Sequence, residues 1–192
     1  MEAAGVRSAV LARRMVVGLC CWLSTSCGGA EDATAPEHPA DTPASFSDLF
    51  GPVLVKADGG QVGIQAIQSK ALVGIYFAAG WCPACAAFTP QLVSAYDGWR
   101  KADKSLEIVL VSLDNSSADM FVHMKTRGMA WLAMPYDAAK IRGLAQLYGV
   151  EWIPTLIIVD GDRTIITKDG RDDVVVKGAA AFDAWVAASQ GR

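Results

Sequence analysis

The chain has 192 residues, of which 52% are hydrophobic and 19% are charged, and its formal net charge is −3. This length suffices for one globular domain with a sizeable core and an additional tail. The charge shows no basic excess, so nothing electrostatic favours nucleic-acid binding and no nucleic-acid partner is expected.

An export signal is predicted over residues 1–27. Three arginines precede or border a short apolar run at residues 15–23, and small residues then lead to Cys27. A positive region, an apolar region and small residues, in this order, are typical of a cleaved signal, and the apolar run is too short to span a bilayer. The alternative, a buried N-terminal helix, is disfavoured by Gly18 and by the glycines that follow Cys27.

Cys27 suggests how the exported protein could be attached to a membrane. Small residues followed by a cysteine resemble the lipobox of bacterial lipoproteins, in which this cysteine becomes the lipidated first residue. The resemblance implies membrane attachment by a lipid on Cys27, with the protein facing a periplasmic or other extracytoplasmic compartment. Ordinary signal cleavage after Ser26 explains the same residues and would give a soluble secreted protein.

A disordered tether is predicted at residues 28–45. This segment is rich in Ala, Pro, Asp, Glu and Thr and lacks apolar periodicity. Such a composition cannot bury a core. The ordered part of the chain is therefore predicted to be a single domain at residues 46–190.

Strands and helices alternate along this domain. Apolar runs predict strands at residues 52–56, 72–78, 106–113, 155–159 and 164–167. Helical spacing predicts helices after residue 82 and at 117–126, 138–148 and 179–189. Ser116 is the expected N-cap of the second helix and Gly149 the expected end of the third, while residues 61–70 are compatible with a short helix and residues 131–135 with a connecting segment. The order implies an α/β fold, in which a central mixed sheet is flanked by helices on both faces.

The first long helix presents one apolar face. Phe88, Leu92, Tyr96 and Trp99 recur at spacings of four, four and three residues, which places them on one side of a helix. Pro90 lies inside this pattern and is expected to kink the helix rather than end it, because the pattern continues beyond the proline.

Two cysteines open this helix in the sequence Trp81-Cys82-Pro83-Ala84-Cys85. Thiol chemistry depends on the thiolate, and a helix N-terminus stabilises negative charge. A pair at this spacing can hold a dithiol, close a disulfide between Cys82 and Cys85, and exchange it with a substrate. Cys82 is predicted to be the more exposed sulfur and the nucleophile, and Cys85, one turn deeper, the resolving thiol.

A cysteine pair at this spacing can also serve in a zinc site or in a permanent structural disulfide. A zinc site needs about four ligands, but the predicted domain has no further cysteine and only His123 as a histidine, so no metal is expected. A permanent structural disulfide suits an exported protein. However, a bond that closes so short a loop removes little chain entropy, so stability alone explains it poorly.

A second candidate site is the segment Ile153-Pro154-Thr155, directly before a predicted core strand. Proline lacks an N–H and is disfavoured inside a sheet, whereas a cis-proline is tolerated at the start of a strand. Few X-Pro bonds are cis, so the segment gains its meaning from its pairing with the cysteines.

The cysteine pair and the segment around Pro154 together resemble the thioredoxin superfamily, and within it the tryparedoxin and nucleoredoxin proteins. The resemblance rests on residues 75–92, 131–136 and 148–156, and it extends over residues 47–190. It implies a thioredoxin-like fold and a thiol–disulfide oxidoreductase, of the tryparedoxin-like protein-disulfide reductase kind, that needs no metal and no organic cofactor.

The resemblance also implies roles for individual residues. Cys82 and Cys85 would exchange as dithiol and disulfide with a protein substrate. Pro154 would be a cis-proline opposite these cysteines, and Ile153 would offer backbone hydrogen bonds to the substrate. The substrate-binding residues implied in this way are Trp81, Pro83, Ile153 and Pro154.

Two positions depart from related patterns. Thioredoxin proper has a buried acid six residues before its first cysteine, where this chain has Tyr76. Another group or water must then take the proton of Cys85, and tyrosine at this position fits the tryparedoxin branch. The second proline usual inside the motif is Ala84 here, which leaves the reduction potential and the direction of exchange open.

Protein disulfides or dithiols are the expected substrates, and a monomer is expected. An exported location lacks cytosolic reductant, so an unidentified electron donor at the membrane is implied. Two rival functions stay open on the sequence, namely a thiol peroxidase on the same fold and a non-catalytic binding module that carries an inert disulfide.

Several other side chains suggest chemistry but have simpler explanations. Met120 and Met124 lie one helical turn apart and are expected to pack rather than to bind copper. His123 lies between them and is expected on a polar, solvated face. Asp114 is expected to act either as a proton relay or as a helix cap. Two tryptophans are expected either to line the substrate surface or to pack in the core: Trp131 and Trp152.

Overall fold

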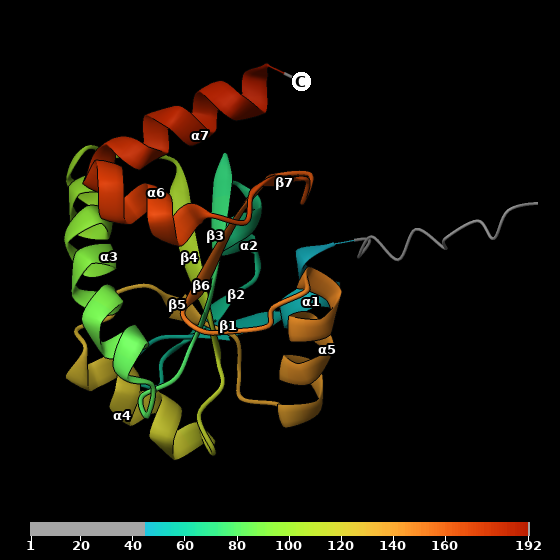
Figure 1. The fold of residues 1–192 in the computed structure, drawn as a ribbon. Coiled ribbons are helices and arrows are strands. Elements are labelled where there is room, and N and C mark those ends of the chain that lie inside the picture. The colour runs from blue at the N-terminus through green and yellow to red at the C-terminus, as the bar shows by residue number, and fades with distance from the viewer. Residues whose placement is uncertain (1–44, 192) are drawn as a thin grey trace, which may run out of the picture. The chain divides into compact units, whose positions relative to one another are not determined.

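The structure is a computed structural model that describes residues 45–191. At its centre lies a seven-stranded sheet with the strand order β2-β1-β5-β4-β3-β6-β7 (Figure 1). The strands are β1 (Val53–Val55), β2 (Gln61–Gly63), β3 (Leu72–Ala78), β4 (Leu106–Ser112), β5 (Leu132–Ala133), β6 (Thr155–Asp160) and β7 (Ile165–Thr167). Strands β3, β4 and β5 run parallel, whereas β6 pairs antiparallel with β3 and β1 pairs antiparallel with β5.

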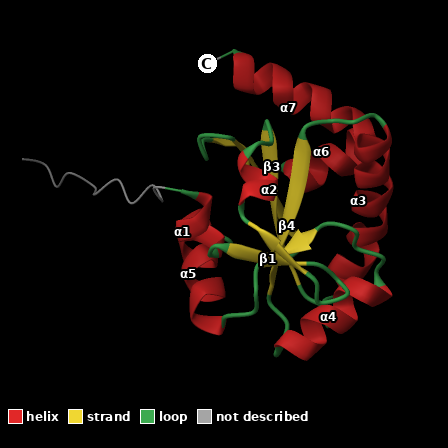
Figure 2. Ribbon diagram, turned by 180° about the vertical axis from the view of Figure 1, so that it is seen from behind, coloured by secondary structure: helices red, strands yellow, loops and turns green. Residues whose placement is uncertain are grey.

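Helices cover both faces of the sheet, as Figure 2 shows from behind. The helices are α1 (Phe46–Phe50), α2 (Gln65–Gln68), α3 (Pro83–Lys101), α4 (Ser117–Thr126), α5 (Ala138–Tyr148), α6 (Gly170–Lys177) and α7 (Ala181–Gln190), with a 3₁₀ turn at Gly178–Ala180. Side chains of α3, α4, α6 and α7 join one apolar cluster, and those of α1, α2 and α5 join another. The α/β fold with a mixed sheet between two helical layers is thus confirmed.

Strand β3 lies in the middle of the sheet and feeds both clusters. All seven of its residues are buried. Leu72, Tyr76 and Ala78 belong to the cluster under α3, whereas Val73, Ile75 and Phe77 belong to the cluster on the opposite face. This alternation follows from the two-residue repeat of a strand, and burial on both faces explains why the run is almost wholly apolar.

Several predicted elements are confirmed to the residue. The strand at 72–78 and the helices at 117–126 and 138–148 have the expected bounds. The Ser116 side chain caps α4, and Gly149 ends α5 in the left-handed region at φ 67°. Helix α3 continues through Pro90, and its predicted apolar face is buried.

Other elements differ from the predictions. Residues 61–70 contain strand β2 before the short helix α2, and the connecting segment at 131–135 includes strand β5. These strands are too short to show a periodic pattern. Helices α1 and α6 were not predicted, because α1 is only five residues long and α6 buries only Gly170 and Val174.

The predicted export signal at residues 1–27, with Cys27, lies outside the described residues, as does the predicted tether apart from Ser45. Among residues 45–191, none of the helices combines the length and apolar character that crossing a membrane requires.

Candidate active site at the N-terminus of helix α3

Cys82 is the N-cap residue of α3 and directly follows the loop that leaves β3. Its sulfur accepts a hydrogen bond of 3.1 Å from the backbone N–H of Cys85, and its carbonyl accepts one of 3.0 Å from Ala86. Pro83 occupies the first turn, where its missing N–H has no intrahelical partner to lose. The sulfur therefore sits where unpaired N–H groups and the helix dipole stabilise a thiolate.

Cys85 lies one helical turn deeper. It is fully buried, whereas Cys82 retains 5% of its surface, so Cys82 is the more exposed sulfur as expected. Burial, followed by the hydrogen bond with Cys82, raises the pKa of Cys85 to about 12. Both cysteines are free thiols. The structure thus describes the dithiol, and the Cys82–Cys85 disulfide stays a prediction.

The segment before β6 lies against the first cysteine. The Ile153–Pro154 peptide bond is cis, as the family resemblance implied. The Cys82 thiol donates to the Ile153 carbonyl across 3.7 Å. Antiparallel pairing of β3 with β6, in which Phe77 faces Thr155, brings these distant parts of the chain together.

The three tryptophans that the sequence suggested for the site divide between surface and core. Trp81 and Trp152 are 59% and 67% exposed, and the Trp81 indole N–H donates to the Leu113 carbonyl at 3.1 Å. Trp131 is 1% exposed and packs edge-on against Tyr76 and Tyr96. Of the two tryptophans for which a surface or core role was open, only Trp152 therefore reaches the surface.

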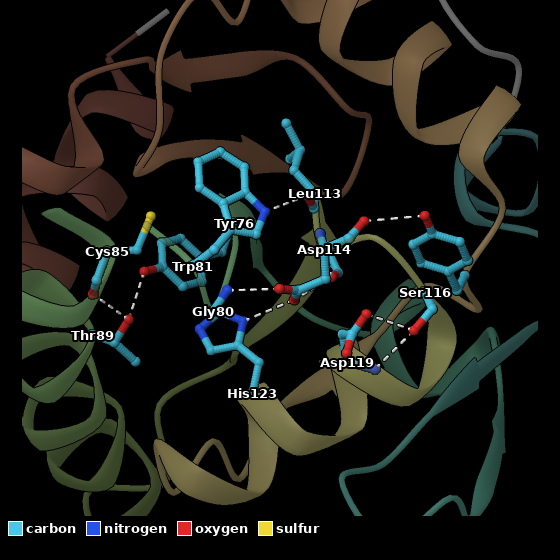
Figure 3. Close-up of polar contacts among 12 residues, drawn as sticks. Tyr76, Gly80, Trp81, Cys85, Thr89, Leu113, Asp114, Ser116, Asp119 and His123 are labelled. Atoms are coloured by element: carbon cyan, nitrogen blue, oxygen red, sulfur yellow. Dashed lines mark hydrogen bonds and ion pairs between the residues drawn. The ribbon is translucent and has the colours of Figure 1, made fainter. Parts of the chain in front are cut away.

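Tyr76 lies on β3 and is linked to Cys85 of α3 through Thr89 (Figure 3). Its hydroxyl is 2.8 Å from that of Thr89, and Thr89 donates to the Cys85 carbonyl at 2.8 Å. Because the single hydroxyl proton of Thr89 is donated to that carbonyl, Tyr76 must be the donor in the hydrogen bond between the two hydroxyls. Burial raises the pKa of Tyr76 above its ordinary value. The phenol therefore stays protonated and is not a base for Cys85.

The prediction that His123 is solvated is wrong. His123 is 3% exposed, and its Nδ1 lies 3.1 Å from a carboxylate oxygen of Asp114. Met120 and Met124, which pack in the core as expected, lie three residues before and one after it. Positions 120, 123 and 124 share one helix face, and this spacing in the sequence could have revealed the burial of His123.

Asp114 does not cap a helix, since Ser116 caps α4. Its carboxylate accepts hydrogen bonds from the Gly80 N–H, the Ser112 hydroxyl and His123. Burial alone would raise the pKa of Asp114, but the hydrogen bonds from His123, Ser112 and Gly80 outweigh burial and hold it below its usual value. Asp114 is therefore a buried carboxylate tied to the loop before Cys82.

Nothing in the site resembles a metal centre. Within the part of the chain that the structure describes, His, Cys, Asp and Glu side chains form no group of three or more that could hold a metal ion.

The sheet order, the cysteine pair at a helix N-terminus and the facing cis-proline together define a thioredoxin fold with a dithiol site. The chain belongs to the thioredoxin-like family, whose sequence pattern matches residues 70–165. It is 38% identical over 138 residues to nucleoredoxin from Bos taurus, a match that covers 69% of this chain and 30% of the bovine protein.

Solved structures agree with this assignment. Thioredoxin from Wuchereria bancrofti is 37% identical with a TM-score of 0.60, over 73% of this chain and 97% of that one. Tryparedoxin from Trypanosoma brucei is 33% identical with a TM-score of 0.63, over 71% of this chain and 92% of that one. The resemblance to the tryparedoxin and nucleoredoxin branch is thus confirmed, although the chain spans less than a third of the bovine nucleoredoxin.

Proposed function

We propose that this protein is a thiol–disulfide oxidoreductase that exchanges its Cys82–Cys85 pair with protein disulfides. The observation that carries the proposal is the contrast between the two sulfurs. Cys82 lies at the helix N-terminus and receives an N–H at 3.1 Å, while Cys85 is fully buried with a raised pKa. Such a contrast supports attack by Cys82 and resolution by Cys85.

In the first step, the Cys82 thiolate attacks one sulfur of the substrate disulfide. A new bond forms between Cys82 and that sulfur, the substrate S–S bond breaks, and the departing substrate thiolate takes a proton from water. The Ile153 carbonyl, which already faces the Cys82 sulfur at 3.7 Å, is positioned to bond the backbone of a substrate strand. Trp81, Pro83 and Pro154 would complete the docking surface.

In the second step, Cys85 loses its proton and attacks the Cys82 sulfur. The Cys82–Cys85 disulfide forms, and the second substrate sulfur leaves and is protonated. The substrate has then gained two electrons and the protein has lost two. Because Tyr76 stays protonated, it is not the base that takes the Cys85 proton, and water or the departing substrate thiolate can take that proton instead. A separate thiol donor must reduce the protein for another cycle, and the reverse steps would oxidise a dithiol.

The location of this reaction is part of the proposal. The positive residues, apolar run and Cys27 of residues 1–27 support an exported protein that is anchored by a lipid and faces an extracytoplasmic compartment. In such a compartment, the reductant would have to come from a donor at the membrane.

The proposed exchange is tested by measuring how much the protein accelerates the reduction of insulin by dithiothreitol. Cys82→Ala should abolish catalysis, and Cys85→Ala should accumulate a mixed disulfide between Cys82 and the substrate on a non-reducing gel. A variant that combines Cys82→Ala with Cys85→Ala keeps the three cysteines before residue 28. It therefore controls for adducts on those cysteines. Activity that survives Cys82→Ala would contradict the proposal, as would efficient peroxide turnover without a partner enzyme combined with no insulin reduction.

A further inference from the structure

A buried polar cluster lies beside the cysteine loop but outside the dithiol itself. It consists of Ser112 at the end of β4, Asp114 in the following connection and His123 on α4. One oxygen of the Asp114 carboxylate accepts hydrogen bonds from the Ser112 hydroxyl at 2.7 Å and from His123 Nδ1 at 3.1 Å. Ser112, Asp114 and His123 are 2%, 7% and 3% exposed, so this cluster is screened from solvent.

The other oxygen of the same carboxylate holds the loop before Cys82. It accepts a hydrogen bond of 2.7 Å from the backbone N–H of Gly80, as Figure 3 shows. A Cβ on residue 80 would lie 3.3 Å from Asp114 and from His123, so glycine permits this close approach. The Trp81 indole N–H also donates a hydrogen bond to the Leu113 carbonyl. The loop before Cys82 is thus held by two hydrogen bonds to the segment that follows β4.

His123 supplies one of three hydrogen bonds to this buried carboxylate. An ionised carboxylate only accepts hydrogen bonds, so His123 Nδ1 must carry a proton. The other ring nitrogen, Nε2, is buried and has no hydrogen-bond partner among the described residues. An unpaired buried nitrogen costs stability, which indicates that the ring serves the molecule through Nδ1.

We infer that His123 is a positioning residue for Cys82, a role that rests on the proposed exchange reaction. Through Asp114 it fixes the Gly80 N–H, and so orients the loop that places the Cys82 sulfur at the start of α3. There the sulfur receives the Cys85 N–H at 3.1 Å. Without the imidazole, the carboxylate keeps two donors in a buried site and loses the orientation that holds Gly80.

The reactivity of the Cys82 thiolate tests this role directly. The reduced full-length protein is alkylated with iodoacetamide at pH 7, and peptide mass spectrometry follows the label on Cys82 separately from the other cysteines. We expect His123→Leu to slow alkylation by about two- to fivefold, the size of effect that a helix N-terminus has on a nearby charge. His123→Asn should restore the rate, because its amide nitrogen lies near the position of Nδ1.

Met124→Ala is the matched control. Met124 is fully buried on the same helix but makes no polar contact with Asp114. It should lower the free energy of unfolding without slowing alkylation, which separates positioning from general loss of stability. A wild-type rate in His123→Leu, an equal loss in Met124→Ala, or no recovery in His123→Asn would each overturn the inference. Alkylation needs no substrate disulfide, so its result does not depend on whether insulin is reduced.

Discussion

The Tyr76 hydroxyl donates a 2.8 Å hydrogen bond to Thr89, whose own hydroxyl donates to the carbonyl of Cys85. The central strand β3 is thereby joined to the first turns of α3 through two buried hydroxyls. Where thioredoxin proper has an acid, this protein has a neutral link that supports the helix carrying the dithiol.

This link predicts a loss of stability rather than of catalysis. Tyr76→Phe removes one buried hydrogen bond while Thr89 keeps its bond to Cys85, so we expect a loss of about 1 kcal/mol in the free energy of unfolding. Thr89→Val should cost about 1–3 kcal/mol, because it leaves the Tyr76 hydroxyl buried without a partner. Urea unfolding of the reduced proteins measures both. A large fall in the rate of mixed-disulfide resolution in Tyr76→Phe would instead show that the phenol transfers a proton.

The raised pKa of Cys85 predicts the pH dependence of resolution. Burial is its main cause, and the reactive form is the thiolate. We therefore expect the rate at which Cys85 resolves a mixed disulfide on Cys82 to rise about tenfold per pH unit between pH 6 and 9. The mixed disulfide is made by labelling Cys82 with thionitrobenzoate, and stopped-flow absorbance then measures the rate at which Cys85 releases thionitrobenzoate. A rate that is constant over this range would contradict the prediction.

The same pKa predicts how the stability of the dithiol form changes with pH. The pKa of Cys85 is about 12 in the fold against an ordinary value of 9.0, so the folded state favours the neutral thiol. The stabilisation is complete below the ordinary value and is lost as the pH rises toward the folded value. Urea unfolding at pH 9 and above should show a steeper loss of stability with rising pH for the wild type than for Cys85→Ala. If the free energy of unfolding fell equally with pH in the two proteins, this prediction would be contradicted.

The two tryptophans with opposite exposure should respond differently to truncation. Trp152→Ala removes an exposed indole from the residue that precedes Ile153 in the chain, so we expect a several-fold rise in the KM for a protein disulfide with kcat unchanged. Trp131→Ala empties a buried site and should cost about 3–5 kcal/mol of stability. Insulin-reduction kinetics and urea unfolding separate the two effects. An unchanged KM in Trp152→Ala would show that this exposed tryptophan takes no part in substrate docking.

Lipid attachment predicts a simple result in a bacterial host that exports the protein. Cys27→Ser should abolish incorporation of labelled palmitate and release the protein from the membrane fraction. Cys21→Ser, a change within the apolar part of the leader, is the matched control and should leave both unchanged. Labelling that persists in Cys27→Ser would exclude this cysteine as the attachment point and favour ordinary signal cleavage.

Local patterns predicted those elements whose burial repeats regularly. The helix at 138–148 combines an apolar face with a glycine that ends it, and both features are written in adjacent residues. Strand β5, with two residues, and helix α6, with a mostly exposed surface, carry no comparable repeat. Their formation depends on neighbouring elements that supply hydrogen bonds and apolar contacts.

The sequence by itself determined the fold class, the dithiol of Cys82 and Cys85, and the start of α3 at that pair, because these depend on residues close together in the chain. The family resemblance implied that Ile153 and Pro154 lie opposite this pair, but only the tertiary structure decided the individual contacts around the dithiol. Ile153 reaches the Cys82 sulfur through the pairing of β6 with β3, and His123 reaches Asp114 through the packing of α4 against the sheet. Such contacts depend on strand order, register and helix rotation, which short-range periodicity does not encode.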